Sequence, residues 1–336
     1  MSKFSLDVLQ QRVFPYVQSE DPDVVLGAAF GEDVALTRVG GDVLVSHVDP
    51  IVGAVGDIGW LAVHVACNDI AASGIRPRWL HLLVLVPSMH DLELLEQIMQ
   101  DASHAAAEIG ASIVGGHTGY SVGLSRPLVS VTALGTASGQ EPVLTGGAQV
   151  GDHVLVTKGI ALEGTAILAQ DFDDVARERG LSDDELERGR RVMAKVSVMP
   201  EALVLAENGV TAMHDVTRGG ILETLLEIAS LSQVGIELTF SLLPIPRIVS
   251  RFAEAFPFDP LRMISSGTLA VTVPQGRVEE VSEALKALEM PFAFVGRVTD
   301  GDGVEVHHDG EITRYTEIRC EEDELARLWA LHPRHG

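Results

Sequence analysis

Four aspartates stand at points where apolar runs give way to turns or helix ends. Asp33 follows the glycines of a predicted bend at 27–36, Asp49 ends the alternating run 43–48, Asp69 lies in the last turns of the next helical pattern, and Asp215 precedes a glycine pair. Carboxylates gathered in one cleft repel one another unless a cation neutralises them, and Mg²⁺ prefers oxygen ligands. If the fold brings these aspartates together they require a metal. Solvated turns are the alternative.

A second group of candidates is Gly115-Gly116-His117-Thr118, which follows a short predicted strand at 111–114. Glycine has no Cβ, so a phosphate or a metal can approach the backbone closely, and His117 and Thr118 add side-chain donors or ligands. The segment 115–119 is therefore predicted to be a binding loop.

The third group is the motif HDVTRGG at 214–220, which opens an amphipathic helical pattern at 221–229. Backbone amides at a helix start and the Arg218 guanidinium both favour a phosphate, and Gly219 and Gly220 let it approach the backbone. Asp215 suits a metal or a ribose, and a plain strand-to-helix turn is the alternative. His117 and His214 are the candidates for a general base. Lys158-Gly159 leads into another helical pattern at 162–168 and suits an anion in the same way.

The elements that must position these residues alternate between strands and helices. Apolar runs predict strands at 43–48, 79–86, 129–135, 153–157, 210–213, 236–240, 267–273 and 292–298. Helical spacing with caps predicts helices at 57–72, 91–110, 201–207, 221–229 and 278–288. A Gly-rich connection at 139–151 separates the halves. We predict an α/β domain at 1–145 and an α+β domain at 146–336.

The composition excludes several classes of protein. The 336 residues include 24 basic and 48 acidic side chains, and the net charge of −24 would repel nucleic acid and anionic membranes. The two cysteines, Cys67 and Cys320, provide neither a disulfide framework nor a zinc spacing. The first residues lack the apolar core of a signal peptide, and no run is long enough to span a membrane. We expect a cytoplasmic enzyme with a small-molecule substrate.

The motifs GEDVAL at 31–36, VDP at 48–50, NDIAASG at 68–74, GGHT at 115–118 and HDVTRGG at 214–220 occur in a familiar order. They resemble the ATP-dependent, PurM-like superfamily typified by aminoimidazole ribonucleotide synthetase, and within it the HypE family of hydrogenase-maturation proteins. The resemblance covers nearly the whole chain. It implies an N-terminal domain whose strands pair with a second subunit to form a dimeric β-barrel, a C-terminal α+β domain, and ATP with Mg²⁺ in the cleft between them.

The resemblance also assigns residues to roles. Asp33, Asp49 and Asp69 correspond to the acids that hold magnesium and nucleotide phosphates, and Asp215 to the acid of the second domain. The implied nucleotide contacts further include Asn68, Gly115, Gly116, Thr118, Lys158, Gly219 and Gly220. His117, His214 and Arg218 are the candidates for catalysis. A homodimer and a maturation partner protein are expected.

Two departures from the HypE pattern bear on the reaction. HypE-like sequences usually carry Asp where His117 stands, and imidazole suits a hard cation poorly, so His117 is expected to contact phosphate or substrate. HypE proteins end in a tail with a terminal cysteine, whereas this sequence ends LHPRHG and Cys320 lies upstream, where a structural role is expected. The alternatives are a thiamine-monophosphate-kinase-like enzyme, although DVTRGG replaces the DISDGL motif of that family, and a non-catalytic nucleotide-binding scaffold.

The function predicted from the sequence is phosphoryl transfer from ATP, with Mg²⁺, to an amide or carbonyl oxygen or a phosphate of a small substrate. In-line transfer depends on positioning and charge neutralisation more than on a covalent nucleophile. A site made of acids, glycines and one arginine suits that chemistry. The identity of the acceptor stays open.

Overall fold

The computed structural model describes residues 4–52, 57–319 and 323–332. The N-terminal half contains a six-stranded sheet in the order β1-β2-β3-β6-β4-β5, in which β4 and β5 are parallel and the other pairs antiparallel. Its elements are α1 (Leu6–Arg12), α2 (Phe14–Val17), β1 (Val24–Leu26), β2 (Ala35–Val39), β3 (Asp42–Val52), α3 (Ile58–Ala72), β4 (Pro77–Val86), α4 (Leu92–Ile109), β5 (Ser112–Tyr120) and β6 (Leu128–Thr136).

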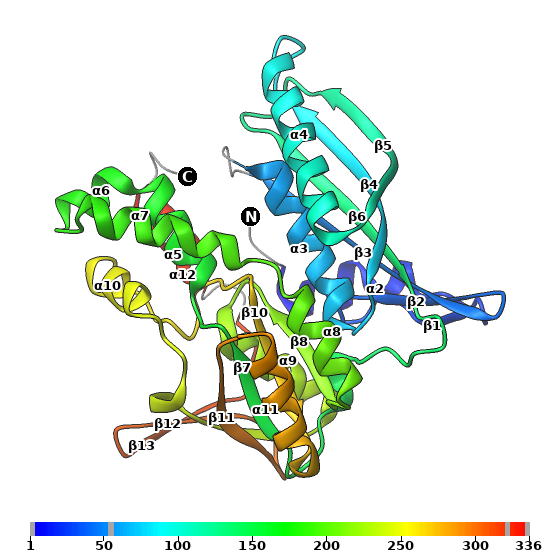
Figure 1. Cartoon of the computed structure of the whole chain (residues 1–336), viewed down its shortest axis with the longest axis vertical. Helices are drawn as coiled ribbons and strands as arrows, with labels where there is room; N and C mark the ends of the chain where they lie inside the picture. Colours follow the sequence, from blue (N-terminus) through cyan, green and yellow to red (C-terminus); the bar gives the residue numbers. More distant parts are fainter. Residues whose placement is uncertain (1–3, 53–56, 320–322, 333–336) are drawn as a thin grey trace.

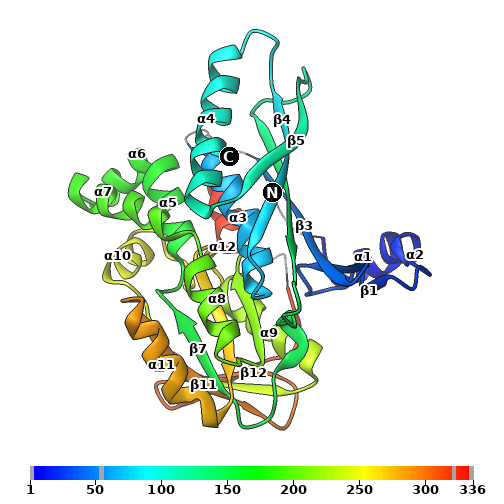
Figure 2. The ribbon, with the colours of Figure 1, turned by 45° about the vertical axis from the view of Figure 1, so that its right-hand side comes forward.

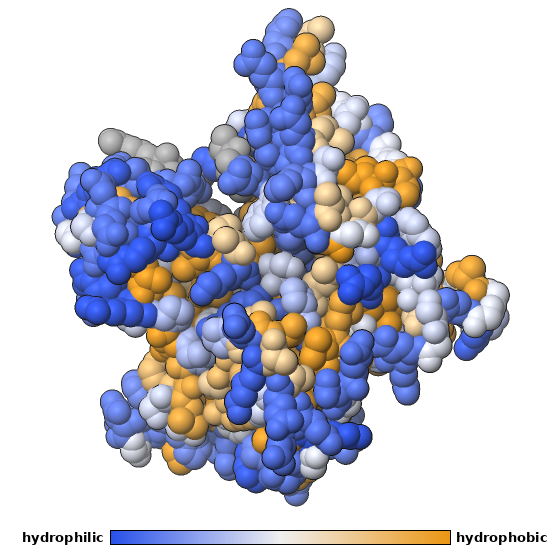
Figure 3. Space-filling view, viewed as in Figure 1, coloured by the Kyte–Doolittle hydropathy of each residue, from blue (hydrophilic) through white to orange (hydrophobic). Residues whose placement is uncertain are grey.

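Helices α3 and α4 cover one face of this sheet (Figures 1 and 2). Alternate residues of β4, such as Leu80 and Leu82, are buried beneath the helices, while Leu83 on the opposite face is 36% exposed. Val114 and Tyr120 of the edge strand β5 are also exposed, at 53% and 56%. Figure 3 shows apolar side chains gathered over β4 and β5. The sheet therefore has one packed face and one uncovered, partly apolar face.

The second half contains a seven-stranded sheet in the order β13-β12-β9-β11-β7-β10-β8. Its strands are β7 (His153–Thr157), β8 (Ala212–Val216), β9 (Gly235–Thr239), β10 (Thr268–Val273), β11 (Phe292–Thr299), β12 (Gly303–His308) and β13 (Glu311–Tyr315). The helices are α5 (Leu162–Asp171), α6 (Asp173–Glu178), α7 (Asp183–Arg191), α8 (Met199–Glu207), α9 (Gly220–Ser232), α10 (Arg247–Ala255), α11 (Val278–Ala287) and α12 (Glu324–Leu331), with short 3₁₀ turns η1 (Thr145–Gly147), η2 (Val192–Lys195), η3 (Phe240–Leu242) and η4 (Gln275–Arg277).

The two faces of this second sheet pack against different helices. Buried residues of α9 contact one face, and α8 with α11 covers the other. A separate apolar cluster joins α5, α6, α7, α10 and α12 at one side of the molecule. The outer surface of the α6–α7 lobe is dominated by hydrophilic residues in Figure 3, as the dense charge of 171–191 predicts.

The helix α3 agrees with its prediction because its ends are set by local signals. It begins after Asp57, whose side chain makes no capping hydrogen bond, and ends at Ala72, two residues before Gly74, which has a φ of +77°. All of its residues except Trp60 are buried, because α3 lies between the first sheet, α4 and the second half. Gly59 allows the close crossing with α4, since a Cβ there would come within 2.1 Å of the Ile98 carbonyl oxygen.

Two predictions about the first sheet are wrong. The strand predicted to end at Asp49 continues to Val52, with Pro50 opposite Ser130 of β6. Pro50 is tolerated because β2 pairs with β3 only as far as Ser46, so one side of β3 needs no donor at residue 50. The segment Gly115–Gly119 is not a loop but part of β5, paired with β4. There Gly116 has a φ of +148°, and a Cβ would meet the Leu82 carbonyl oxygen at 2.0 Å.

None of the helices in the described part of the chain is both long and apolar enough to cross a membrane. Cys320, for which a structural role is predicted, lies outside the described residues. Cys67 lies in α3, where burial raises the pKa of its thiol.

Candidate active site

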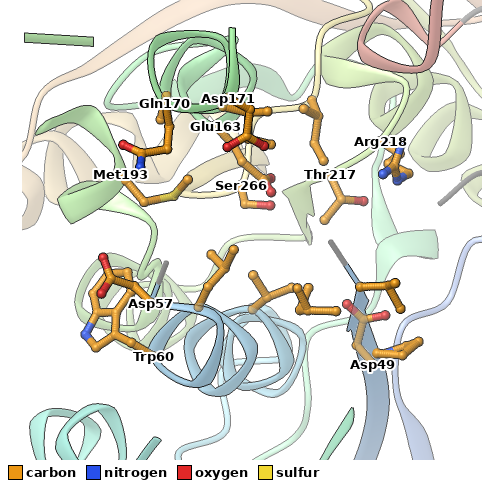
Figure 4. Close-up of a pocket in the computed structure, with 18 of the residues that line it drawn as sticks. Asp49, Asp57, Trp60, Glu163, Gln170, Asp171, Met193, Thr217, Arg218 and Ser266 are labelled. Carbon is orange, nitrogen blue, oxygen red and sulfur yellow. The ribbon is translucent and has the colours of Figure 1, made fainter. Parts of the chain in front are cut away.

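A cavity of about 450 Å³ lies where the two halves meet (Figure 4). Its walls come from β3 and the start of α3 in the first half, and from α5, the turn after β8 and α12 in the second. The polar and aromatic residues that line it are Asp33, His47, Asp49, Asp57, Trp60, Asp69, Glu163, Gln170, Asp171, Arg190, Thr217, Arg218, Ser266 and Trp329.

The predicted acids meet at one end of this cavity. Asp33, Asp49 and Asp69 line it, and atoms of Asp33, His214 and Asp215 that can bind a metal all lie within 4.8 Å of one another. Burial raises the pKa of Asp69 well above its ordinary value, and the nearby charges of Asp215, Asp33 and Asp49 raise it further. The chain thus gathers these carboxylates from β3, α3, β8 and the turn before β2.

Asp215 is the least compensated of these acids. It is completely buried, and neither carboxylate oxygen accepts a hydrogen bond from any residue that the structure describes. The His214 ring nitrogen Nδ1 is 3.8 Å from the Asp215 Oδ1 atom, which is too long for a hydrogen bond. Burial raises the pKa of Asp215. A buried carboxylate without donors is costly, and a bound cation would relieve that cost.

His214 bridges the two halves as a cation. Its Nδ1 lies 2.9 Å from the Asp33 Oδ2 atom and its Nε2 lies 3.0 Å from the Glu227 Oε2 atom. Burial alone would lower the pKa of His214, but Asp33, Asp215 and Glu227 together raise it well above its ordinary value. Both ring nitrogens then carry protons: Nε2 donates a hydrogen bond to Glu227, and Nδ1 forms an ion pair with Asp33. This geometry does not favour His214 as a general base, because no nitrogen is left to accept a proton.

His47 is a site residue that the sequence reasoning missed. Its Nε2 lies 3.4 Å from the Asp69 Oδ2 atom, and its Nδ1 contacts the backbone carbonyl of Asp33. His47 lies two residues before Asp49 on β3, so both side chains point to the same face of the strand. The two-residue spacing between His47 and Asp49 on a predicted strand was the sequence signal that could have identified His47 as a site residue.

Asn68 and Lys158, predicted as nucleotide ligands, are used elsewhere and do not line the cavity. The Asn68 Nδ2 donates to the Val196 carbonyl at 2.8 Å, and its Oδ1 accepts from the Val198 amide at 2.9 Å. The Lys158 ammonium lies 2.6 Å from the Glu201 Oε1 atom and donates to the carbonyls of Lys195 and Ser197. Burial lowers the pKa of Lys158 although Glu201 opposes that shift. Asn68 therefore links α3 to residues 196 and 198, and Lys158 links the end of β7 to residues 195 and 197 and to α8.

Arg218 lies at the other end of the turn that begins with Asp215. Thr217 and Arg218 line the cavity, and α9 starts directly after Gly219. Gly219 and Gly220 have φ values of +80° and +65°, and a Cβ on Gly220 would come within 2.4 Å of the Leu261 carbonyl oxygen. The Arg218 Nη1 lies 3.4 Å from the Asp323 Oδ2 atom, and its guanidinium lies 5.8 Å from the centre of the Trp329 ring.

The Gly-Gly-His-Thr group does not reach this cavity. Gly115, Gly116, His117 and Thr118 lie exposed on the edge strand β5 and are absent from the cavity wall of the described chain. The structure therefore brings together Asp33, Asp49, Asp69, His214, Asp215 and Arg218, and it places Asn68, Lys158 and the β5 group apart. Glu163, Trp60, Trp329 and Glu227 are further residues of this region that the sequence did not single out.

Comparison with known proteins identifies the family. The family model for AIR synthase related protein, N-terminal domain, matches residues 31–137, and that for the C-terminal domain matches residues 149–309. A putative hydrogenase expression/formation protein of Methanocaldococcus jannaschii is 29% identical over 262 residues, which span 76% of this chain and 75% of that protein. The carbamoyl dehydratase HypE of Azotobacter vinelandii is 30% identical over 248 residues, spanning 72% of this chain and 69% of that protein.

Solved structures share the fold. HypE in complex with ATP has a TM-score of 0.72 at 24% identity, with 91% of this chain and 92% of that chain covered. The HypE–HypF complex gives 0.70 at 24% identity and coverages of 84% and 93%. Thiamine-monophosphate kinase from Stenotrophomonas maltophilia K279a gives 0.68 at 24% identity and coverages of 88% and 93%. The matched ranges and the identity to HypE agree with the PurM-like resemblance seen in the motifs. The chain belongs to the AIR synthase related family, which includes the HypE hydrogenase-maturation proteins.

Proposed function

We propose that this protein uses ATP and Mg²⁺ to activate a small substrate by phosphoryl transfer to an amide or carbonyl oxygen or to a phosphate. The observation that carries the proposal is the buried carboxylate of Asp215, whose oxygens accept no hydrogen bond from the described residues, beside Asp33 and Asp69. The relatives of this protein support the same chemistry, since one is a carbamoyl dehydratase and a structural neighbour was solved with ATP.

The donor atoms fit a magnesium ion. Asp33, Asp49, Asp69 and Asp215 offer hard carboxylate oxygens, and the orphaned oxygens of Asp215 need a positive partner. Mg²⁺ would neutralise phosphate charge when bound there. His214 and His47 act differently: they hold Asp33, Asp69 and Glu227 in place by hydrogen bonds and ion pairs.

The phosphate-facing residues of this chain are Thr217 and Arg218, which line the cavity, whereas the amides of Gly220 and Leu222 at the start of α9 already donate to the carbonyls of Thr217 and Leu261. The Arg218 guanidinium attracts anionic oxygens and does not need to accept a proton. Arg218 is oriented by Asp323, so it is positioned before any ligand arrives. Positioning of this kind is what in-line phosphoryl transfer depends on.

We further propose that the protein is a homodimer in which a second copy covers the exposed face of the first sheet. Strand β5 ends that sheet, and its apolar residues Val114 and Tyr120 lie on the surface. Pairing there would close the sheets of two copies into the barrel that the family resemblance implies. The same arrangement would allow Gly115, Gly116, His117 and Thr118 to serve the partner's site. The domain boundary near residue 145, between the two matched family ranges, is part of this proposal.

HypE is a carbamoyl dehydratase, and on that ground an amide oxygen is the proposed phosphoryl acceptor. HypE also forms a complex with HypF, so a maturation partner protein is proposed for this chain as well. Thiamine-monophosphate kinase shares the fold and supplies the second candidate acceptor, thiamine monophosphate.

The test measures ATP binding by calorimetry and ADP release by the purified protein. We expect Mg²⁺-dependent ATP binding that is lost in Asp69→Asn and in Asp215→Asn and kept in Asp309→Asn, which changes a carboxylate that is 92% exposed. ADP release should rise with one member of a panel of small carboxamides. A rise with thiamine monophosphate alone would assign the kinase reaction instead, and tight ATP binding without ADP release under any condition would favour a scaffold.

A further inference from the structure

The cavity also has a wall to which the proposed phosphate chemistry assigns no role, although this wall lies within electrostatic reach of Arg218 and Asp49. On the side of α5, Figure 4 shows Glu163 beside Ser266 and Asp171, across the cavity from Asp49, Asp57 and Trp60. Glu163 is not among the residues that form the metal-binding group of the described chain. Its carboxylate would repel a phosphate, so it needs a different ligand.

Glu163 has a free acceptor atom at a buried position. Its side chain is only 6% exposed, and its Oε2 atom accepts no hydrogen bond from the described residues. Ser266 lies beside the same carboxyl group. A buried acceptor without a donor is costly, so an N–H or O–H of a ligand is the natural partner for Oε2.

The walls around Glu163 are apolar and aromatic. Trp60 from the start of α3 and Trp329 from α12 line the cavity together with Ile167, Met193 and Ile264. Aromatic and aliphatic walls with one fixed polar group are the usual composition of a site for a flat organic molecule. A single buried carboxylate sets which edge of that molecule enters.

We propose that this end of the cavity is the acceptor subsite, that Glu163 is its specificity-determining residue, and that it takes a flat, N–H-bearing nitrogen heterocycle that also carries the amide oxygen or phosphate to be phosphorylated. The inference rests on the proposed function, because it supplies the second substrate of that reaction. Glu163 accepts the N–H hydrogen bond, and the aromatic walls contact the ring. The bound molecule then lies between Glu163 and the phosphate-facing residues Thr217 and Arg218.

The test uses two probes of equal shape, 2-aminopyridine and 2-methylpyridine, and ligand-observed NMR for their dissociation constants. We expect wild-type protein to bind 2-aminopyridine at least about tenfold more tightly, since only this probe offers an N–H donor. Glu163→Met keeps the length of the side chain but removes both acceptor oxygens, and it should abolish the preference. Glu178→Met makes the same change at an exposed position of α6 and should keep it.

Further arms separate this inference from the proposed function. Thermal melting must show that Glu163→Met is folded, and Glu163→Ala serves if it is not. Mg²⁺ with a non-hydrolysable ATP analogue should leave the affinity for 2-aminopyridine within about twofold, and Glu163→Met should still bind ATP. Displacement of 2-aminopyridine by the analogue would assign this end to the nucleotide and overturn the proposal, as would equal binding of both probes by wild type. Failure of ATP to bind at all, with the probe preference intact, would overturn the proposed function and not the subsite.

Discussion

Asp215 is a carboxylate that the fold buries completely and leaves without a donor among the described residues. His214 offsets part of the charge around it but is itself shared between Asp33 and Glu227. The metal-free protein therefore stores unfavourable electrostatics in its site. Sites of this kind are built for a ligand rather than for stability.

The buried ionisable groups of the site make the stability of the metal-free protein depend on pH. The pKa of Asp69 and of Asp215 is raised above 3.8 by burial, so each binds a proton more readily in the folded chain. Their contribution to stability therefore falls as pH rises above about 4. The pKa of His214 is raised above 6.5, so its contribution is present below that value and is lost as pH rises through the folded value. Both effects have the same sign.

We therefore expect the melting temperature in EDTA to fall between about pH 5 and pH 8, and Mg²⁺ to reverse much of the loss. Differential scanning fluorimetry across this range measures it. Asp69→Asn should flatten the profile. Hydrogen bonds to Ser182 and Arg251 lower the pKa of Glu185 to about 2. Its titration therefore affects stability only in acid and does not change the profile between pH 5 and pH 8. A melting temperature that rises steadily from pH 5 to pH 8 in EDTA would contradict the assignment.

At the scale of elements, α12 connects the end of the described chain to the site. Asp323 precedes this helix, and its Oδ1 accepts from the Ala326 amide at 2.6 Å while its Oδ2 pairs with Arg218. Leu325 and Leu328 bury α12 against α5 and its neighbours. One carboxylate thus caps a helix and orients the arginine proposed to face phosphate.

Replacing Asp323 by alanine should separate these two roles. The loss of the cap should cost about 1 kcal/mol of unfolding free energy, and the release of Arg218 should also weaken Mg²⁺–ATP binding several-fold. Ser182→Ala is the matched control, because Ser182 caps α7 away from the cavity. Urea unfolding and calorimetry measure both quantities. If the two variants lose stability equally and bind ATP equally, Asp323 is only a cap.

The elements also show what the sequence could reveal. The end of α3 follows from Gly74 and the start of α9 from Gly219, because glycines act within a few residues, whereas α9 continues to Ser232, past its predicted end at 229. Gly115 and Gly116 misled the prediction, since the same glycines that suit a phosphate loop also allow a strand to approach its neighbour closely. Local sequence does not separate these two uses.

Local sequence patterns also could not predict which residues that lie far apart in the sequence contact one another. The aspartates were predicted individually from strand and helix ends, but their pairing with His47 and His214 depends on how β3, α3 and β8 meet. Glu163 followed a helical pattern and gave no sign of burial, because its environment comes from Ser266 and α12 far along the chain. The residue types indicated what chemistry the site could perform, and only the tertiary packing showed which side chains lie together in that site.

At the scale of the whole molecule, the first sheet leaves an apolar face open. Leu83 and Val114 are exposed on it, whereas the opposite face is packed by α3 and α4. Exposed apolar residues on an edge strand favour association, and the proposed second copy would provide a matching surface with two-fold symmetry.

A charge on that face should keep the protein monomeric. We expect wild type to elute as a dimer in size-exclusion chromatography with light scattering, and Val114→Glu to elute as a monomer, because the new carboxylate would be buried without a partner. Val150→Glu adds the same charge at a residue that is 60% exposed in the connection between the sheets, and it should stay dimeric. A monomeric wild type would remove the dimer from the proposal and leave the β5 residues without a role in the site.

The contacts of Asn68 have a consequence for the divergence of related sequences. The amide of Asn68 recognises only the main chain of residues 196 and 198, so any side chain at those two positions can satisfy it. Substitutions there therefore need no compensating change at Asn68 itself, whereas the buried Val196 side chain packs against Leu61 and Val65 of α3. Statistical coupling between position 68 and positions 196–198 should be weak across an alignment, even though the contact joins the two halves of the molecule beside the acids.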